Sequence, residues 1–208
     1  MDTLVKTFVA LGFVVGLWGS ALAAPIADVT QPTDTIVLVH GQDDGDGQIS
    51  TGGGDNPPPN ETVEKAIDND SNTKYLNFLD LNSGFRVTLD SYGPAPLTGI
   101  ALTTANDSPP RDPASVTITG SNNGADWLPI VTDLPTSLPD DRFTDTEFGF
   151  SPLTPGAFLM YEVIFPTLKD AGNANSMQIG EVRLLPEPAT LALLGLGVIG
   201  LAARRRRA

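Results

Sequence analysis

The C-terminal end of the chain strongly limits what the chain can fold into. Residues 189–203 are fifteen residues without a charge, and four arginines follow them: Arg204, Arg205, Arg206 and Arg207. A helix through this run would be about 22 Å long and apolar all round, with no polar face to meet water. Arginine side chains can extend such a helix toward the roughly 30 Å hydrocarbon core of a membrane, and they favour its cytoplasmic side. We therefore expect a transmembrane helix over 189–203; the alternative is a C-terminal helix that packs on the folded domain.

The N-terminal end has the pattern of a secretory signal peptide. Residues 1–6 carry one lysine, an apolar run follows over 7–22, and the sequence Ala21-Leu22-Ala23 fits the small-x-small pattern of a cleavage site. We expect residues 1–23 to be removed; a permanent N-terminal anchor is the alternative. Together the two ends predict a chain exported across the inner membrane, with everything between them outside the cytoplasm.

The parts of the C-terminal end also occur in a known order. Pro186, Glu187 and Pro188 precede the apolar run, and the arginines close it. This order resembles the PEP-CTERM sorting signal of Gram-negative bacteria over 186–208. The resemblance implies that an exosortase, a membrane protease-transpeptidase, cuts the chain near the Pro-Glu-Pro tripeptide. It implies transient anchoring in the inner membrane, then delivery to the cell surface or the extracellular matrix of bacteria that make exopolysaccharide.

The segment between the two signals is acidic. Residues 24–203 hold seven lysines and arginines against twenty-four aspartates and glutamates, and the whole chain has a net charge of −13. Such a field repels nucleic acid, so we expect no nucleic-acid partner. It suits the binding of divalent cations, although solubility alone also accounts for it. The chain has no cysteine, so an exported domain of about 160 residues must be stabilised by its core rather than by disulfides.

Short runs of apolar residues fill the middle of the chain. The runs 85–90, 100–102 and 115–119 alternate apolar with polar or small residues, whereas 127–131 and 158–165 are apolar on both parities. Alternation predicts strands with one face on a core, and the other two runs predict more deeply buried strands. Many short strands at roughly ten-residue spacing, bounded by Gly, Pro, Asn or Asp, predict an all-β antiparallel β-sandwich.

Other segments carry weaker signals. Residues 24–60 are expected to hold a first strand over 35–40 and a loop rich in glycine, proline and aspartate, which is either a surface loop or a calcium loop. The expected helical turn lies at 62–67. In the last strand, 177–185, the apolar phase slips at Gly180-Glu181. The slip predicts a β-bulge that would aim Glu181 at a specific partner.

Three local patterns lie in order within 61–185: AIDNDSNTKY at 66–75, GSNNGADW at 120–127 and GEV at 180–182. Together they resemble the discoidin family, the galactose-binding-like jelly roll also called the coagulation factor type C domain. The family's glycine is replaced by Asn69, its tryptophan by Tyr75, and a common aspartate by Asn123. Asparagine tolerates left-handed backbone, so the turns survive these changes. The resemblance implies a discoidin-like jelly-roll sandwich.

The resemblance also implies a structural Ca²⁺. Carried over by residue, its ligands would be Asp68, Asp70, Thr73 and Glu181, with backbone carbonyls beside them. Ca²⁺ prefers six to eight oxygen ligands, and these residues supply carboxylate and hydroxyl oxygens. The alternative is that the two aspartates only cap a turn while Glu181 is solvated.

The family resemblance favours a non-catalytic module that binds extracellular carbohydrate or exopolysaccharide. Tyr75 and Trp127 could stack on sugars and Arg111 could bond a hydroxyl; alternatively both aromatic rings belong to the core and Arg111 pairs with Asp112 or a nearby loop. A structural protein of the envelope or biofilm matrix is the second hypothesis. An enzyme is disfavoured, because the chain has one histidine, His40, no cysteine and no G-x-S-x-G motif.

Overall fold

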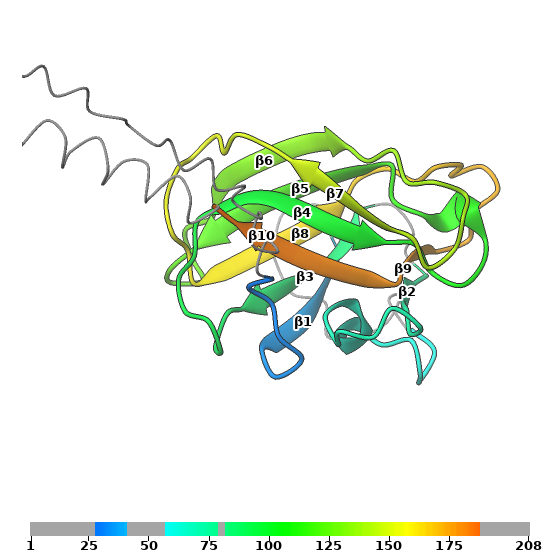
Figure 1. Ribbon diagram of the computed structural model, residues 1–208, viewed down its shortest axis with the longest axis horizontal. Helices are drawn as coiled ribbons and strands as arrows, with labels where there is room; N and C mark the ends of the chain where they lie inside the picture. The colour runs from blue at the N-terminus through cyan, green and yellow to red at the C-terminus, as the bar shows by residue number, and fades with distance from the viewer. Residues whose placement is uncertain (1–27, 41–56, 79–81, 188–208) are drawn as a thin grey trace, which may run out of the picture.

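The computed structural model describes residues 28–40, 57–78 and 82–187 (Figure 1). The predicted signal peptide, the helix over 189–203, the arginines and most of the acidic loop after residue 40 lie outside the described residues. Within the described ranges, no helix has the length and apolar character needed to cross a membrane.

The described chain is built from short strands and two 3₁₀ turns. The strands are β1 (Thr35–His40), β2 (Tyr75–Asn77), β3 (Ser83–Thr88), β4 (Leu97–Thr103), β5 (Ser115–Ser121), β6 (Leu128–Pro135), β7 (Asp145–Gly149), β8 (Met160–Phe165), β9 (Met177–Ile179) and β10 (Glu181–Pro186). The turns are η1 (Val63–Ala66), at the predicted position, and η2 (Pro109–Arg111), which the sequence analysis missed.

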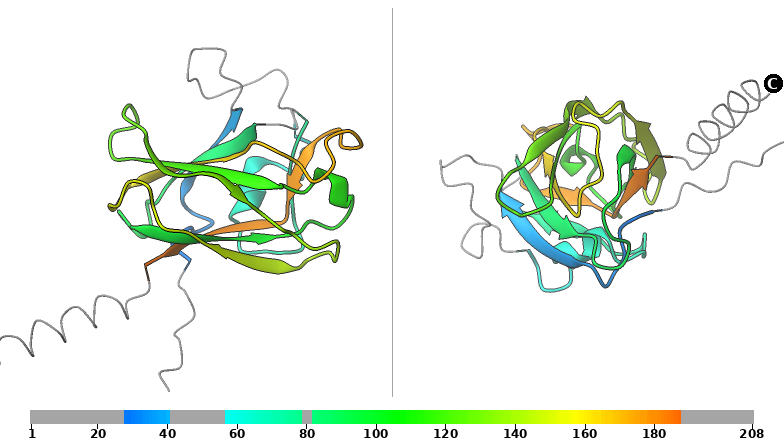
Figure 2. Two further views of the ribbon diagram at one scale, coloured as in Figure 1. Left: turned by 90° about the horizontal axis from the view of Figure 1, so that it is seen from above. Right: turned by 90° about the vertical axis from the view of Figure 1, so that its left-hand side faces the viewer.

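These strands form an antiparallel β-sandwich. One sheet has the order β1-β3-β8-β5-β6, the other β10-β4-β7, and a short pair, β2-β9, lies at one end (Figures 1 and 2). All paired strands in the described residues run antiparallel. The all-β sandwich predicted from the sequence is therefore confirmed. Because β1 pairs with β3, the sandwich also includes chain that precedes residue 61.

The core lies between the two sheets and follows the predicted alternation. Phe85, Val87 and Leu89 are buried, whereas Arg86 and Thr88 between them are partly exposed. Strand β8 behaves in the same way: Tyr161 and Val163 are buried and their neighbours less so. The prediction that both faces of β8 are deeply buried was therefore wrong. Each large apolar side chain buried here contributes about 1.5–3 kcal/mol.

The run at 127–131 also departs from expectation. It forms the start of β6, which is an edge strand of the five-stranded sheet, and Leu128 is 44% exposed. Ile130 and Val131 are buried. A strand at the edge has a neighbour on one side only, so apolar residues on both parities do not ensure that both faces are covered.

Gly180 marks a change of sheet. Strand β9, before Gly180, pairs with β2, whereas β10, after it, pairs with β4. The single strand predicted over 177–185 is therefore divided into two. The Gly180 N–H donates to the Thr103 carbonyl oxygen at 2.8 Å, and a Cβ at this position would lie only 3.0 Å from that oxygen. The phase slip is real, but its cause is this change of sheet, which lets both halves of the segment face the core.

Candidate functional site

The acidic loop between η1 and β2 folds around Asp68. The Asp68 carboxylate accepts hydrogen bonds from the Asp70 N–H at 3.1 Å, from the Thr73 hydroxyl at 2.9 Å and from Lys65 Nζ at 3.0 Å. Asn69 has a φ of 59°, the left-handed backbone that asparagine tolerates. These contacts make the loop compact and hold the Asp68 carboxylate in place.

Glu181 is the unusual residue of this region. It is the first residue of β10, is only 4% exposed, and neither carboxylate oxygen has a hydrogen-bond partner among the described residues. The pKa of Glu181 is raised to about 8, first by burial and then by the negative charges of Asp68 and Asp28, against a smaller opposite effect of the Asp70 and Asn69 amides. A buried carboxylate without a partner is costly, so this group is suited to a positive ligand or a proton.

The residues fit a calcium ion in part. The Asp68 and Glu181 carboxylates come from distant parts of the chain and are close enough to interact. In the described ranges, however, no three acidic, histidine or cysteine side chains converge into a metal cluster. An ion here would therefore need backbone carbonyls or water as its other ligands, which Ca²⁺ accepts readily.

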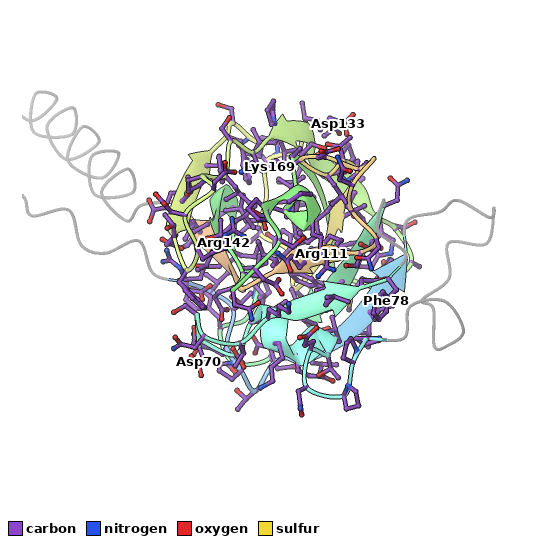
Figure 3. The ribbon with its side chains drawn as sticks, turned by 90° about the vertical axis from the view of Figure 1, so that its right-hand side faces the viewer. Asp70, Phe78, Arg111, Asp133, Arg142 and Lys169 are labelled. Atoms are coloured by element: carbon purple, nitrogen blue, oxygen red, sulfur yellow. The ribbon has the colours of Figure 1, made fainter. Side chains whose placement is uncertain are left out.

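The other two predicted ligands have different contacts. The Asp70 carboxylate accepts hydrogen bonds from the Asn72 N–H at 3.0 Å and from Asn72 Nδ2 at 2.9 Å, which lower its pKa. Figure 3 shows Asp70 at the outer edge of the molecule. The Thr73 hydroxyl donates to Asp68. In this structure Asp70 and Thr73 shape the loop, whereas Asp68 and Glu181 supply the neighbouring carboxylates.

Asp28 is an acidic residue near this region that the sequence analysis missed. Its Oδ1 atom accepts from the Thr30 N–H at 2.9 Å, whereas its Oδ2 atom is buried without a partner in the part of the chain that is described. Burial raises the pKa of the Asp28 carboxyl. The neighbouring Val29 N–H donates to the Leu184 carbonyl oxygen at 3.0 Å, so this segment lies along β10. No local motif places Asp28 near Glu181.

A second group of polar residues fixes the loops at one end of the sandwich. Arg142 forms a bidentate ion pair with the fully buried Asp112, at 3.0 and 2.6 Å, and donates to the Asp107 carbonyl oxygen at 3.0 Å. Lys74 Nζ contacts the Asp107 carboxylate at 3.0 Å, and Gln178 Nε2 donates to the carbonyl oxygens of this loop. This network ties together four segments that are far apart in sequence.

The loops held by this network present Arg111 and Phe143. Arg111 is half-buried, and it makes no ion pair within the described residues, because Arg142 has taken the Asp112 carboxylate. Phe143 is 48% exposed and has a φ of 56°, which is rare for a bulky side chain. Figure 3 shows Arg111 and Arg142 at the same end of the sandwich. Backbone in this region costs free energy for a bulky residue, and residues of this kind cluster at functional sites.

Of the two aromatic residues that could stack on sugars or belong to the core, Tyr75 belongs to the core and Trp127 does not. Tyr75 is fully buried, and its hydroxyl contacts the Gly84 carbonyl oxygen and Asn77, so it offers no face to a ligand. Trp127 is half-buried on the outside of the five-stranded sheet, with the Arg86 guanidinium 4.6 Å from its ring centroid. Trp127 is thus not a core residue, and the Arg86 guanidinium occupies one face of its ring, where a sugar would stack.

The sorting tripeptide begins at the edge of the described domain. Pro186 is the last residue of β10 and Glu187 is the last described residue. Pro188 and the arginines lie beyond the described residues. The family model of the PEP-CTERM protein-sorting motif matches residues 185–207. The chain carries a PEP-CTERM sorting motif. This motif implies export and sorting by an exosortase.

Solved structures resemble the described fold. The CBM32 module CpGH89CBM32-5 from Clostridium perfringens is 12% identical, with a TM-score of 0.52 over 76% of this chain and 99% of that chain. The family 32 carbohydrate-binding module of C. perfringens NanJ is 14% identical, with a TM-score of 0.50 over 73% and 92%. An F5/8 type C domain from Bacteroides fragilis is 16% identical, with a TM-score of 0.53 over 74% and 91%.

These likenesses show a discoidin-like fold and, at such low identity, the fold alone. They confirm the resemblance to the coagulation factor type C domain that the three sequence patterns indicated. No curated protein sequence matches the chain significantly.

Proposed function

We propose that this protein is an exported, non-catalytic module that binds extracellular carbohydrate after sorting by an exosortase. Two of the similar structures are modules solved with sugars, one with GalNAc-β-1,3-galactose and one with galactose. The sorting motif supports a place of action outside the cytoplasm. On this proposal the processed protein acts at the cell surface or in the exopolysaccharide matrix.

The observation that carries the proposal is the loop end that presents Arg111 and Phe143. A guanidinium donates several hydrogen bonds in a fixed geometry, which suits sugar hydroxyls, and an aromatic ring packs against the apolar face of a sugar. The buried pair of Arg142 and Asp112 holds the loops before any ligand arrives. Such preorganisation lowers the entropy that binding must overcome.

The test is sugar binding by the processed protein recovered from the producing cells. A glycan array with galactose- and GalNAc-containing glycans, together with the host exopolysaccharide, should give specific binding that free sugar competes away. Arg111→Ala and Phe143→Ala should each weaken that binding at least about tenfold. Tyr92→Ala is the matched control, because Tyr92 is an exposed aromatic residue in the loop between β3 and β4, at the opposite end of the sandwich.

The same experiment separates the second hypothesis. A structural matrix protein without a small ligand would show adhesion that salt weakens and free sugar does not affect, because its acidic surface would act through shared cations. Binding of that kind, unchanged in Arg111→Ala and Phe143→Ala, would contradict the carbohydrate proposal.

A calcium ion is a further part of the proposal. Asp68 and Glu181 would hold it, and the ion would supply the positive charge that the buried Glu181 carboxylate lacks among the described residues. Its role would be structural: it would join the loop before β2 to the start of β10.

A further inference from the structure

The sorting motif begins inside the folded domain. The motif covers 185–207, and β10 ends at Pro186, so Leu185 and Pro186 belong to both. Leu185 is 3% exposed and lies opposite Gly99 of β4, so close that a Cβ on Gly99 would be 3.4 Å from its side chain. The last strand of the domain therefore continues into the sorting tripeptide without a linker.

Two hydrogen bonds hold the first residues of the tripeptide on the domain. The Thr98 hydroxyl donates to the Pro186 carbonyl oxygen at 3.3 Å, and the Glu187 N–H donates to the Pro96 carbonyl oxygen at 3.2 Å. The Glu187 side chain is exposed, but its backbone is engaged. A protease cannot pair with backbone groups that already pair with the substrate's own sheet.

The strand is flanked on both sides just before this point. β10 is the edge strand of its sheet, with β4 on one side. On the other side, the Val29 N–H donates a hydrogen bond to the Leu184 carbonyl oxygen at 3.0 Å. Figure 2 shows the first described residues, in blue, beside the end of β10, in orange. The start of the sorting motif is thus held at the part of the domain where the first described residues run along β10.

We propose that folding of the domain controls exosortase processing, because the enzyme acts on chain whose residues 185–187 have separated from β4. Proteases bind extended backbone and commonly cut locally opened states, at a rate that follows the population of the open form. Cleavage breaks one peptide C–N bond: the nitrogen leaves as an amine that takes up a proton, and the carbonyl carbon passes to water or to an acceptor nucleophile. The local stability of the end of β10 then sets the rate, and this inference does not rest on carbohydrate binding.

The matched pair Thr98→Ala and Thr98→Ser tests the proposal. Alanine removes the hydrogen bond to Pro186, whereas serine keeps a hydroxyl that can make it. In the producing bacterium with its own exosortase, a pulse-chase measurement should show Thr98→Ala processed about threefold to tenfold faster than the wild type, the range that one hydrogen bond allows. Thr98→Ser should be processed at nearly the wild-type rate.

A spacer provides the second test. An insertion of six residues, alternating glycine and serine, between Leu185 and Pro186 moves the tripeptide away from β4 and leaves Leu185 in place. Processing should become faster and should no longer respond to Thr98→Ala. The same spacer between Pro155 and Gly156, in an exposed turn, should leave the rate unchanged. Wild-type rates for both Thr98→Ala and the Leu185 spacer, or slower processing of both, would overturn the proposal.

Discussion

Arg142 and Asp112 form a bidentate ion pair, with Nη1–Oδ1 and Nη2–Oδ2 distances of 3.0 and 2.6 Å, across the base of the loop end. Asp112 is fully buried, and the guanidinium also bonds backbone carbonyl oxygens of the two loops that it joins. The pair therefore connects the position of Arg111 to the position of Phe143. It does so without using either side chain.

Arg142→Ala should destabilise the domain by about 3 kcal/mol, because it leaves the Asp112 carboxylate buried without its cation. Urea unfolding of the processed protein measures the change. Arg183→Ala is the control: its pair with Asp145 is partly exposed, so the loss should stay below about 1 kcal/mol. Equal losses for the two variants would show that Asp112 is adequately supported by its other contacts.

Glu181→Gln should abolish the response of the protein to calcium. With calcium at about a hundred times its dissociation constant, the wild type should gain about 2.7 kcal/mol of stability, and the variant should gain none. Thermal melting with calcium and with a chelator measures both. Asp70→Asn should keep the calcium response, because the Asp70 carboxylate is engaged by Asn72. Identical wild-type melting curves under the two conditions would remove the calcium proposal.

Without calcium, the stability of the protein should fall as the pH rises from 5 to 8. The pKa of Glu181 is raised to about 8 in the folded state, mainly by burial, so the folded chain keeps a proton that the unfolded chain releases near pH 4.5. The bound proton therefore stabilises the folded state fully below pH 4.5, the pKa of the unfolded chain. This stabilisation is lost as the pH rises toward 8, the pKa of the folded chain, and the free energy of unfolding should fall by about 2–4 kcal/mol. Urea unfolding in chelator at several pH values measures it.

Two comparisons check that Glu181 causes this fall of stability with rising pH. Glu181→Gln should remove most of the pH dependence, because glutamine does not titrate. Calcium should reduce the fall in the wild type, since the ion replaces the proton and binds better as the carboxyl deprotonates. If the stability of Glu181→Gln still fell between pH 5 and 8 as it does in the wild type, another titrating group would be its cause.

Local patterns predicted the parts of the fold that depend on neighbours in sequence. The alternation at 85–90 predicted which face of β3 is buried, since the period of two is a property of the strand itself. The first strand was placed at 35–40, and the phase slip at Gly180 marked a real break. Each of these signals lies within a few residues.

What the sequence did not predict depends on topology. The exposure of Leu128 follows from the edge position of β6, which only the order of strands decides. The pairing of Asp112 with Arg142 instead of Arg111 joins residues thirty positions apart. Asp28 lies near Glu181 only because the first described residues run along β10. The three family patterns predicted the fold but left two positions open for Tyr75, on a ligand or in the core, and the packing of the sandwich places it in the core.

Gly180→Ala should destabilise the domain by about 1–3 kcal/mol, because the new methyl group would meet backbone. Its Cβ would lie 3.0 Å from the Thr103 carbonyl oxygen and 3.1 Å from that of Thr104, and neither atom can turn away as a side chain could. Gly172→Ala is the matched control, since its Cβ would meet only the Asp170 carboxylate at 3.5 Å in an exposed turn. Urea unfolding should therefore separate the two variants clearly. A Gly180→Ala variant as stable as Gly172→Ala would mean that the close approach to β4 is not needed for the change of sheet, and the position of Glu181 would need another cause.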